Sequence, residues 1–417
     1  MSEGDRFETE VEGVWGYSPG TPARWSYSSL KDVENCPRRW VLSRARYPGL
    51  WDRHGYPEVP HTAGLLGDVI HHALEVIVRA LGAQGCLATT SSEAVEVLRK
   101  LGGLTAVLRE AIDLKISDLE SNPRIDANTR ENVRQALLDQ VGVASNRVQL
   151  FLSRGRLPAW GSDDGGTSNA SERAGPGGCG PRRRPPLGTG AHPEVDVVAD
   201  DLRLWGRIDL VTVEDGGVTI TDYKSGKEDP SHDDQVRLYA LLWALDREMN
   251  SDRVAATELV VSYPARERIL PAPDAAVLRS LEASTRARVE KADAEISGAS
   301  AVAKPAAQTC QSCQVRHLCA DFWQQIAPSP SSVGAREWFD LEAIVVRQNG
   351  VKSWVVESAQ GGVEMLVRTP SPSTMLPVGK GIRVLGVRKV DDDPERPGLV
   401  IAALSSTSET YVLRKFE

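Results

Sequence analysis

Apolar residues recur with the period of an amphipathic helix along much of the first third of the chain. Four segments carry this pattern, over residues 26–47, 64–81, 95–118 and 129–153. Each of them predicts a helix with one buried face. Ser28 or Ser29 is expected to cap the first helix, because serine side chains accept hydrogen bonds from the free backbone amides at a helix start.

The helical pattern stops at a segment rich in Gly, Ser, Pro and Arg, residues 161–193. This segment has almost no large apolar side chains, so we expect a disordered surface insertion. Cys179 lies inside it and is expected to have no role of its own. The run Arg182-Arg183-Arg184 either contacts phosphates or is a solvated part of the insertion.

A strand hairpin is predicted over residues 202–223, because β-branched residues flank a turn signal at Asp215-Gly216. The elements expected after it are a helix over 233–248, a strand over 257–263 and a helix over 272–298. Pro328 and Pro330 mark a linker after these elements.

Residues 338–417 differ in character, because only short strand patterns remain there. These patterns cover residues 340–347, 351–357, 363–368, 381–390, 398–404 and 410–414. Five or six strands in about 80 residues predict a small β-barrel over 335–417. An OB-like barrel is our leading interpretation, and an SH3-like barrel would give a similar pattern. The chain would then comprise a flexible N-terminus at 1–24, a main domain at 25–328 and the barrel.

The length and charge of the chain limit its class. A chain of 417 residues is too long for one ordinary core, so about two or three domains are expected. The net charge of −8 argues against coating of nucleic acid by bulk charge, although a local basic groove would suffice for a DNA enzyme. No apolar run is long enough to cross a bilayer, and the acidic start does not read as a signal peptide. We therefore expect a cytoplasmic protein with no membrane partner.

The predicted hairpin brings acidic side chains together. A tight turn at Asp215-Gly216 places Asp209 opposite Asp222, with Cβ atoms about 5 Å apart, and Lys224 points to the same face as Asp222. Two facing carboxylates suit Mg²⁺ or Mn²⁺, which prefer oxygen ligands, and a lysine beside them can orient a water or offset phosphate charge. The simpler alternative is a solvated strand face with a surface salt bridge.

Two predicted helices carry further polar candidates. His71 lies on the apolar helix at 64–81, where it is either a satisfied core residue or a third metal ligand. Gln235 and Tyr239 are four residues apart, so they share one face of the helix that follows the hairpin. They would orient the lysine or contact DNA.

Six cysteines are present, and their spacing is more informative than their number. Cys310, Cys313 and Cys319 form a C-x2-C-x5-C cluster, whereas the other three are scattered. Disulfides are not expected in a cytosolic protein of this length.

These elements, in this order, resemble the RecB-like branch of the PD-(D/E)XK nuclease superfamily. The matching residues are His71, Asp209, Asp222, Tyr223, Lys224, Gln235 and Tyr239. The resemblance implies an α/β, restriction-endonuclease-like core with helical insertions. It also implies a metal site at His71, Asp209, Asp222 and Tyr223, with Lys224 as the catalytic lysine. The helix of Gln235 and Tyr239 would support that site.

The cysteines extend the resemblance. Cys36 precedes the site, and Cys310, Cys313 and Cys319 follow it, as in the nucleases of this branch that hold a [4Fe–4S] cluster. The resemblance implies such a cluster on these four thiolates, where it would clasp the two ends of the nuclease domain. A zinc ion on the same cysteines is the alternative, because four thiolates suit either group. Cys86 has no place in this pattern.

The chain has no phosphate-binding loop of the form G-x4-G-K-[ST], so any helicase motor would be a separate partner protein. The predicted barrel contains several aromatic residues, which either stack DNA bases or fill a core that docks another protein. These residues are Trp338, Phe339, Trp354, Tyr411 and Phe416.

The combined pattern predicts a Mg²⁺- or Mn²⁺-dependent deoxyribonuclease with an iron–sulfur clasp. By resemblance, its substrate is single-stranded DNA or DNA ends, as for an exonuclease in repair, recombination or defence. The alternative is a catalytically silent nuclease fold that binds DNA as a subunit of a helicase–nuclease complex.

Overall fold

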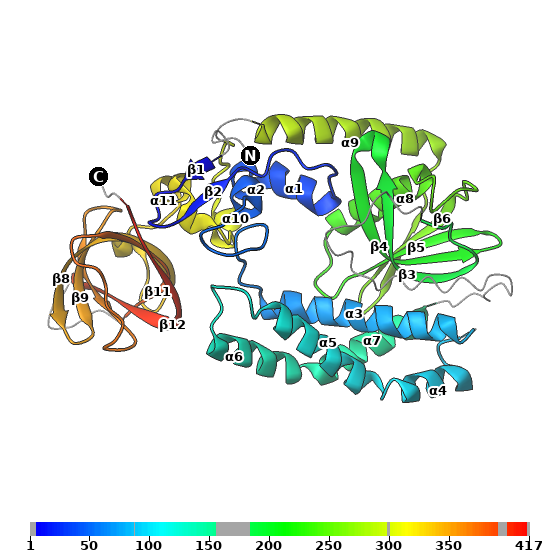
Figure 1. The fold of residues 1–417 in the computed structure, drawn as a ribbon, viewed down its shortest axis with the longest axis horizontal. Coiled ribbons are helices and arrows are strands. Elements are labelled where there is room, and N and C mark those ends of the chain that lie inside the picture. Colours follow the sequence, from blue (N-terminus) through cyan, green and yellow to red (C-terminus); the bar gives the residue numbers. More distant parts are fainter. Residues whose placement is uncertain (1–5, 87, 156–183, 298–300, 391–397, 415–417) are drawn as a thin grey trace. The chain divides into compact units, whose positions relative to one another are not determined.

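The computed structural model describes residues 6–86, 88–155, 184–297, 301–390 and 398–414 (Figure 1). The chain divides into two compact units. The first unit comprises Met1–Thr21, Lys31–Glu58 and Ala292–Glu417, and the second comprises Pro22–Leu30 and Val59–Lys291. These units are assembled from separate segments of the chain, so they do not test the consecutive domain boundaries expected from the sequence, which stay a prediction.

A five-stranded sheet forms the centre of the second unit, in the order β3-β4-β5-β6-β7. Its strands are β3 Gly190–Ala199, β4 Leu204–Glu214, β5 Gly217–Tyr223, β6 Ala256–Ser262 and β7 Glu267–Pro271. β5 and β6 are parallel, and helix α8 (Ser231–Leu245) makes the crossover that a parallel pair requires. The other neighbouring strands are antiparallel, and α8 packs against β3, β4, β5 and β6.

The hairpin predicted at 202–223 is confirmed as β4 and β5. Its Cα pairs run from Leu210–Thr221 to Glu214–Gly217, so the turn falls at Asp215-Gly216 as expected. Leu202, the first residue of the predicted hairpin, belongs instead to a short 3-10 helix, Asp200–Leu202. The helix expected at 272–298 is α9, Ala275–Ile296.

Strand β3 was missed because it begins inside the segment that we expected to be a disordered insertion. Residues 184–193 are described, and the last of them already belong to β3, so the expectation is wrong for this part. Arg184 donates to both carboxylate oxygens of the buried Asp246, at 3.1 and 2.9 Å. Residues 161–183, with Cys179, Arg182 and Arg183, lie outside the described residues.

The apolar helix predicted at 64–81 is confirmed as α3, Thr62–Ala83. The two longer helical segments are each divided, into α4 Ser92–Lys100, α5 Leu104–Asp118, α6 Ala127–Leu138 and α7 Val141–Arg154. Gly102 and Gly103 separate α4 from α5 with φ angles of +80° and +83°, which a right-handed helix does not contain.

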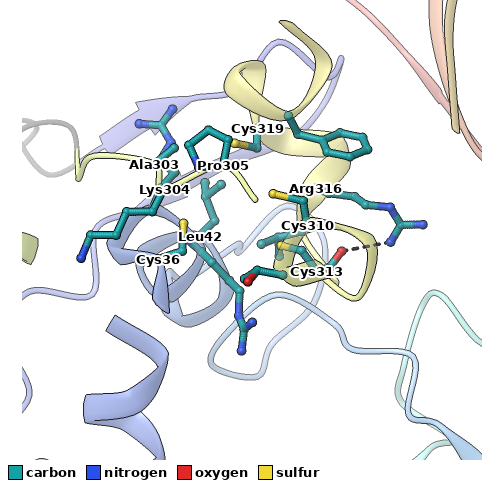
Figure 2. A pocket seen from close by; sticks show the side chains of 14 residues that line it. Cys36, Leu42, Ala303, Lys304, Pro305, Cys310, Cys313, Arg316 and Cys319 are labelled. Atoms are coloured by element: carbon teal, nitrogen blue, oxygen red, sulfur yellow. Dashed lines mark hydrogen bonds between the residues drawn. The ribbon is translucent and has the colours of Figure 1, made fainter. Parts of the chain in front are cut away.

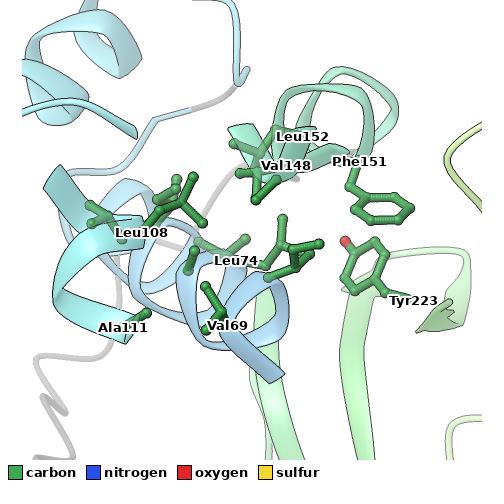
Figure 3. Close-up of a cluster of buried hydrophobic side chains, with 14 of the residues drawn as sticks. Val69, Leu74, Leu108, Ala111, Val148, Phe151, Leu152 and Tyr223 are labelled. Atoms are coloured by element: carbon green, nitrogen blue, oxygen red, sulfur yellow. The ribbon is translucent and has the colours of Figure 1, made fainter. Parts of the chain in front are cut away.

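Helices α3, α5 and α7 bury a shared apolar core against the sheet (Figure 3). The core side chains include Val69, Leu74, Leu108, Ala111, Val148, Phe151, Leu152 and Tyr223. Each large apolar side chain buried here contributes about 1.5–3 kcal/mol relative to exposure. Because Tyr223 ends β5, this core fixes α3 beside the end of that strand.

The helix expected at 26–47 is two helices, α1 (Tyr27–Asn35) and α2 (Pro37–Arg44). Pro37 begins α2, and the residue before a proline is disfavoured in the helical region. Cys36 is therefore extended, with φ −164° and ψ 104°.

The cap of α1 also differs from the expectation. Ser29 N donates to Ser26 Oγ at 3.1 Å, and Ser26 N donates to Ser29 Oγ at 2.8 Å. This reciprocal pair is a capping box in which Ser26 is the capping residue. Neither Ser28 nor Ser29 holds the position that we predicted.

Five strands of the first unit form a closed barrel, in the order β10-β12-β11-β8-β9. They are β8 Trp338–Gly350, β9 Ser353–Ser358, β10 Glu364–Arg368, β11 Gly381–Lys389 and β12 Val400–Val412. The two strands expected at 398–404 and 410–414 are one continuous strand, β12, so that division is wrong.

The expected base-stacking aromatics of the barrel have different environments. Phe339 and Trp354 are buried in the barrel core, and Tyr411 is stacked on a histidine ring. Trp338 is 56% exposed, whereas Phe416 lies outside the described residues. Most of these side chains therefore stabilise the unit itself.

Residues 6–24 include two short strands, so the expectation of a flexible segment over 1–24 is wrong for its described part. β1 (Arg6–Glu8) pairs with β2 (Trp15–Tyr17), and Val11 forms a bridge to Leu413 after β12. Among the described residues, no helix is long and apolar enough to cross a membrane.

Candidate functional site

The β4–β5 hairpin positions the two aspartates that the sequence singled out. Asp222 is buried, with 1% of its surface exposed, and its Oδ2 lies 2.8 Å from Lys224 Nζ. Asp209 Oδ2 accepts a hydrogen bond from Tyr223 N at 2.6 Å across the hairpin. The observed register therefore brings both carboxylates and the lysine to the end of the same pair of strands.

Helix α3 brings His71 to this hairpin. His71 Nδ1 lies 3.3 Å from Asp209 Oδ1, so the histidine faces the carboxylates and is not an isolated core residue. One turn earlier, a Cβ at Gly67 would lie 2.9 Å from Ser225 Oγ. Glycine at this position lets the loop that begins at Lys224 approach α3 closely.

Lys224 is held by a chain of hydrogen bonds from α8. Its Nζ donates to Gln235 Oε1 at 3.0 Å, and Gln235 Nε2 donates to the Tyr239 hydroxyl at 2.8 Å. Tyr239 lies on β4 at Gly206, where a Cβ would come within 2.9 Å of the Tyr239 ring. The four-residue spacing thus orients the lysine, as one of the expected alternatives proposed.

Glu194 is a site residue that the sequence reasoning missed. It lies on β3 between the pairs Pro193–Leu210 and Val195–Ile208, which places it opposite Asp209. Its φ of +52° is in the left-handed region, which is uncommon for a residue with a Cβ and is often retained at functional sites.

The ligand atoms of Glu194, His71 and Asp209 all lie within 4.8 Å of one another. Among the described residues, this is the one group of three His, Cys, Asp or Glu side chains with that proximity. A weak signal existed, since the alternating residues of the strand begin directly after Glu194. The expected insertion ends at residue 193 and the expected hairpin begins at residue 202, so Glu194 belongs to neither.

The crowding of acidic groups changes their protonation. Burial raises the pKa of Asp222 to about 7, and the nearby Asp209 adds to the increase while Lys224 opposes it. Burial likewise raises the pKa of Glu194 to about 7, with a further contribution from Asp209. Burial has the largest single effect on His71 and lowers its pKa, but the charge and hydrogen bond of Asp209, together with the charges of Glu194 and Asp222, bring that pKa to about 9. When all three carboxylates of Asp209, Asp222 and Glu194 are ionised, they outnumber the cations of His71 and Lys224, so a bound metal ion would favour the ionised forms.

The Tyr223 ring lies between His71, with a ring centroid distance of 6.5 Å, and the apolar core. Its ring lies in the apolar core next to Phe151, with a centroid distance of 5.0 Å (Figure 3). Burial raises the pKa of the Tyr223 phenol. Tyr223 can therefore contribute to a metal site through its backbone carbonyl and not through its hydroxyl.

The four cysteines singled out in the sequence line one pocket of the first unit (Figure 2). Cys36 reaches it as the N-cap of α2, where its Sγ accepts from Arg39 N at 3.4 Å. Cys310 lies on α10 (Ala307–Gln311), and Cys313 and Cys319 lie between α10 and α11 (Ala320–Gln325). Cys86 belongs instead to the core of the second unit.

Basic side chains surround this pocket. Arg38, Arg39, Lys304 and Arg316 all line it together with the cysteines. Burial raises the pKa of the Cys313 thiol to about 11, and Arg39 opposes the increase. The thiolate forms that bind metals would thus be favoured by a bound cation and by the surrounding positive charge.

A family model for the PD-(D/E)XK nuclease superfamily matches residues 24–320, which is more than half of the chain. This chain belongs to the PD-(D/E)XK nuclease superfamily. The match includes the hairpin, α3, α8 and all four cysteines, and members of this superfamily are generally nucleases that act on DNA with divalent metals. The superfamily implied by the resemblance is therefore confirmed, while the RecB-like branch stays a prediction.

No curated protein matches this superfamily member. Among solved structures, it is similar to an OB domain from Methanosarcina mazei at 14% identity, covering 20% of this chain and 79% of that one, with a TM-score of 0.17. It is also similar to a murine DNA-binding protein bound with double-stranded DNA, at 8% identity. The similarity covers 51% of this chain and 88% of that one, with a TM-score of 0.18. Scores this low do not identify a fold or a function for this chain.

Proposed function

We propose that this protein is a Mg²⁺- or Mn²⁺-dependent deoxyribonuclease of the RecB-like branch. The observation that carries the proposal is the convergence of His71, Asp209 and Asp222 beside Lys224 at the end of one hairpin. These groups come from α3, β4 and β5, so an ordinary salt bridge on a strand face does not account for the arrangement. Single-stranded DNA or DNA ends are the substrates that the resemblance favours.

The side chains fit a divalent cation. His71, Asp209, Asp222 and Glu194 would hold it. The ligand atoms of His71, Asp209 and Glu194 converge, and the buried Asp222 Oδ2 forms an ion pair with Lys224 but has no hydrogen-bond partner. A bound Mg²⁺ or Mn²⁺ would activate a water and stabilise the charge that develops on the scissile phosphate.

Lys224 would act from a fixed position. Its ammonium is restrained by Asp222 on one side and by Gln235 on the other, and its side chain is 20% exposed. A preorganised cation of this kind can orient the attacking water and offset phosphate charge without reorganising during the reaction. Tyr239 supports the lysine through Gln235 and would not touch the DNA.

The test is cleavage of end-labelled single- and double-stranded DNA by the purified chain. We expect cleavage with Mn²⁺ or Mg²⁺ and none with excess EDTA. A chain that binds both DNAs but cuts neither with either metal would contradict the proposal, and would support the silent DNA-binding subunit instead. The ladder of products would also separate exonuclease from endonuclease action.

Glu194 gives a second test of the metal centre. Glu194→Gln is expected to raise the Mn²⁺ concentration for half-maximal cleavage by about 10- to 100-fold, because it removes one of three converging ligand atoms. Glu75→Gln is the matched control, since Glu75 lines the same pocket but is outside that group of three. If both variants raise the Mn²⁺ concentration for half-maximal cleavage equally, Glu194 acts through its charge and is not a metal ligand.

We further propose a [4Fe–4S] cluster on Cys36, Cys310, Cys313 and Cys319. Zinc binds thiolates at about 2.3 Å, so four tetrahedral sulfurs on one ion lie about 3.8 Å apart. Within the described chain, which includes all four cysteines, no three of these sulfurs lie within 4.8 Å of one another. A cluster holds its thiolates farther apart because each binds a different iron, so the spacing favours the cluster over zinc.

The strand order supports an OB-type barrel. Numbered from β8, the strands follow the order 1-2-3-5-4-1 around the closed barrel, and the third and fifth strands, β10 and β12, are parallel. This is a five-stranded Greek-key arrangement of the OB type. Trp338 is the one aromatic of the described barrel strands that is mostly exposed, so a row of stacking side chains is not part of the proposal.

A further inference from the structure

The cysteine pocket and the barrel are linked by one ion-pair network. The 3-10 helix η3, Arg316–Leu318, lies between Cys313 and Cys319 in sequence. Arg316 Nε lies 2.6 Å from Asp340 Oδ2 on β8, and Arg316 also donates to the Cys313 carbonyl at 3.0 Å. Asp340 Oδ1 accepts from Gly386 N on β11 at 2.9 Å. One carboxylate thus connects two barrel strands to the backbone of a cysteine.

His317 makes a second connection. It is fully buried, its ring is stacked on Tyr411 of β12 at a centroid distance of 4.1 Å, and its Nε2 lies 2.7 Å from the Tyr56 hydroxyl. Its carbonyl accepts from the buried Arg383 of β11 at 2.9 Å. A buried guanidinium requires such hydrogen-bond acceptors, so Arg383 of β11 depends on the cysteine segment for one of its acceptors.

Apolar packing joins the same two regions. Cys310 and Cys319 pack against a small cluster of Phe322, Trp323 and Leu385, the last of which lies on β11. Cys313 belongs to a cluster that includes Leu413, directly after β12. Side chains that flank the sulfurs therefore also cover the barrel strands.

We infer that the cysteine site and the barrel are one cooperative structure, in which metal held by the cysteines stabilises β11 and β12. The inference rests on the proposed metal group of the cysteines. It extends that proposal, since the resemblance implied a clasp of the nuclease domain and no role for the barrel. A substitution of Asp340 on β8 should therefore weaken metal retention, although Asp340 is not among the residues that line the cysteine pocket.

The test compares Asp340→Asn with wild type as the full chain, purified without oxygen and analysed for bound iron and zinc. Asp340→Asn is expected to lose its metal to a chelator roughly tenfold faster, because the ion pair with Arg316 becomes a weaker neutral contact. Glu364→Gln, an exposed carboxylate on β10, controls for the change in charge and should match wild type. If Asp340→Asn does not fold, Tyr56→Phe removes only the hydroxyl that contacts His317.

Hydrogen exchange supplies the reciprocal readout. Removing the metal from wild type should increase amide exchange in β11 and β12 as well as in residues 310–319, while β4 and β5 keep their protection. Unchanged release by both variants, or exchange confined to 310–319, would overturn the inference and leave the cofactor proposal intact. A wild-type chain purified without bound metal would instead remove the cofactor on which both rest.

Discussion

Lys224→Met is expected to lower the rate of Mn²⁺-dependent DNA cleavage by about 100- to 1000-fold while the protein stays folded. Methionine keeps most of the apolar stem of the lysine but removes the ammonium, which lies 2.8 Å from Asp222 Oδ2 and donates to Gln235. The measurement is the single-turnover rate on an end-labelled DNA at saturating Mn²⁺. Saturation separates a catalytic loss from weaker metal binding.

Lys227→Met is the matched control, because Lys227 lies three residues later and is exposed. It should cut at nearly the wild-type rate. Cleavage by Lys224→Met at a rate equal to that of Lys227→Met would remove Lys224 from the chemistry. A second signature follows from charge: Lys224 lowers the pKa of Asp222, so its loss should raise that pKa and move the rising limb of the pH–rate profile to higher pH.

The elements of the site that were predictable are those set by local geometry. The turn at Asp215-Gly216 fixes which residues of β4 and β5 face one another, so the register from Leu210–Thr221 to Glu214–Gly217, next to Asp209 and Asp222, was predictable from the sequence alone. The spacing of Gln235 and Tyr239 predicts that they share one helix face, and Gln235 donates a hydrogen bond to the Tyr239 hydroxyl. Such relations involve few residues and do not depend on distant packing.

Local signals that were available were also misjudged. Pro37 made a helix break at Cys36 predictable, and Gly102-Gly103 made one predictable between α4 and α5. The apolar period continues across both breaks, so by itself it predicts one continuous helix at each place. The break at Cys36 matters to the site, because it makes Cys36 the N-cap of α2, and the Cys36 side chain lines the cysteine pocket.

Features that depend on distant contacts could not be predicted. Glu194 lies opposite Asp209 with a left-handed backbone, which no residue pattern specifies in advance. The first unit is likewise assembled from the N-terminal residues, the segment around Cys36 and the last part of the chain. Its arrangement depends on contacts such as Val11 with Leu413, between residues hundreds of positions apart in sequence.

The second large effect is expected at the cysteine site. Cys313→Ser should lose the bound metal and lower the free energy of unfolding of its unit by about 3–5 kcal/mol, by analogy with the loss of a cross-link that closes a long loop. Wild type purified without oxygen should be brown and hold iron, and the variant should be colourless. Metal analysis, absorbance and thermal unfolding of both proteins provide the measurements.

Cys86→Ser is the appropriate control, because Cys86 is as buried as Cys313 but lies in the apolar core of the second unit, away from the pocket. It should keep the metal and lose only the modest stability expected from burying a hydroxyl. Stoichiometric zinc in colourless wild type would replace the cluster with a zinc site on the same four thiolates. Full metal content in Cys313→Ser would show that the pocket does not use this cysteine, in which case the spacing of the sulfurs would lose its meaning as evidence for a cluster.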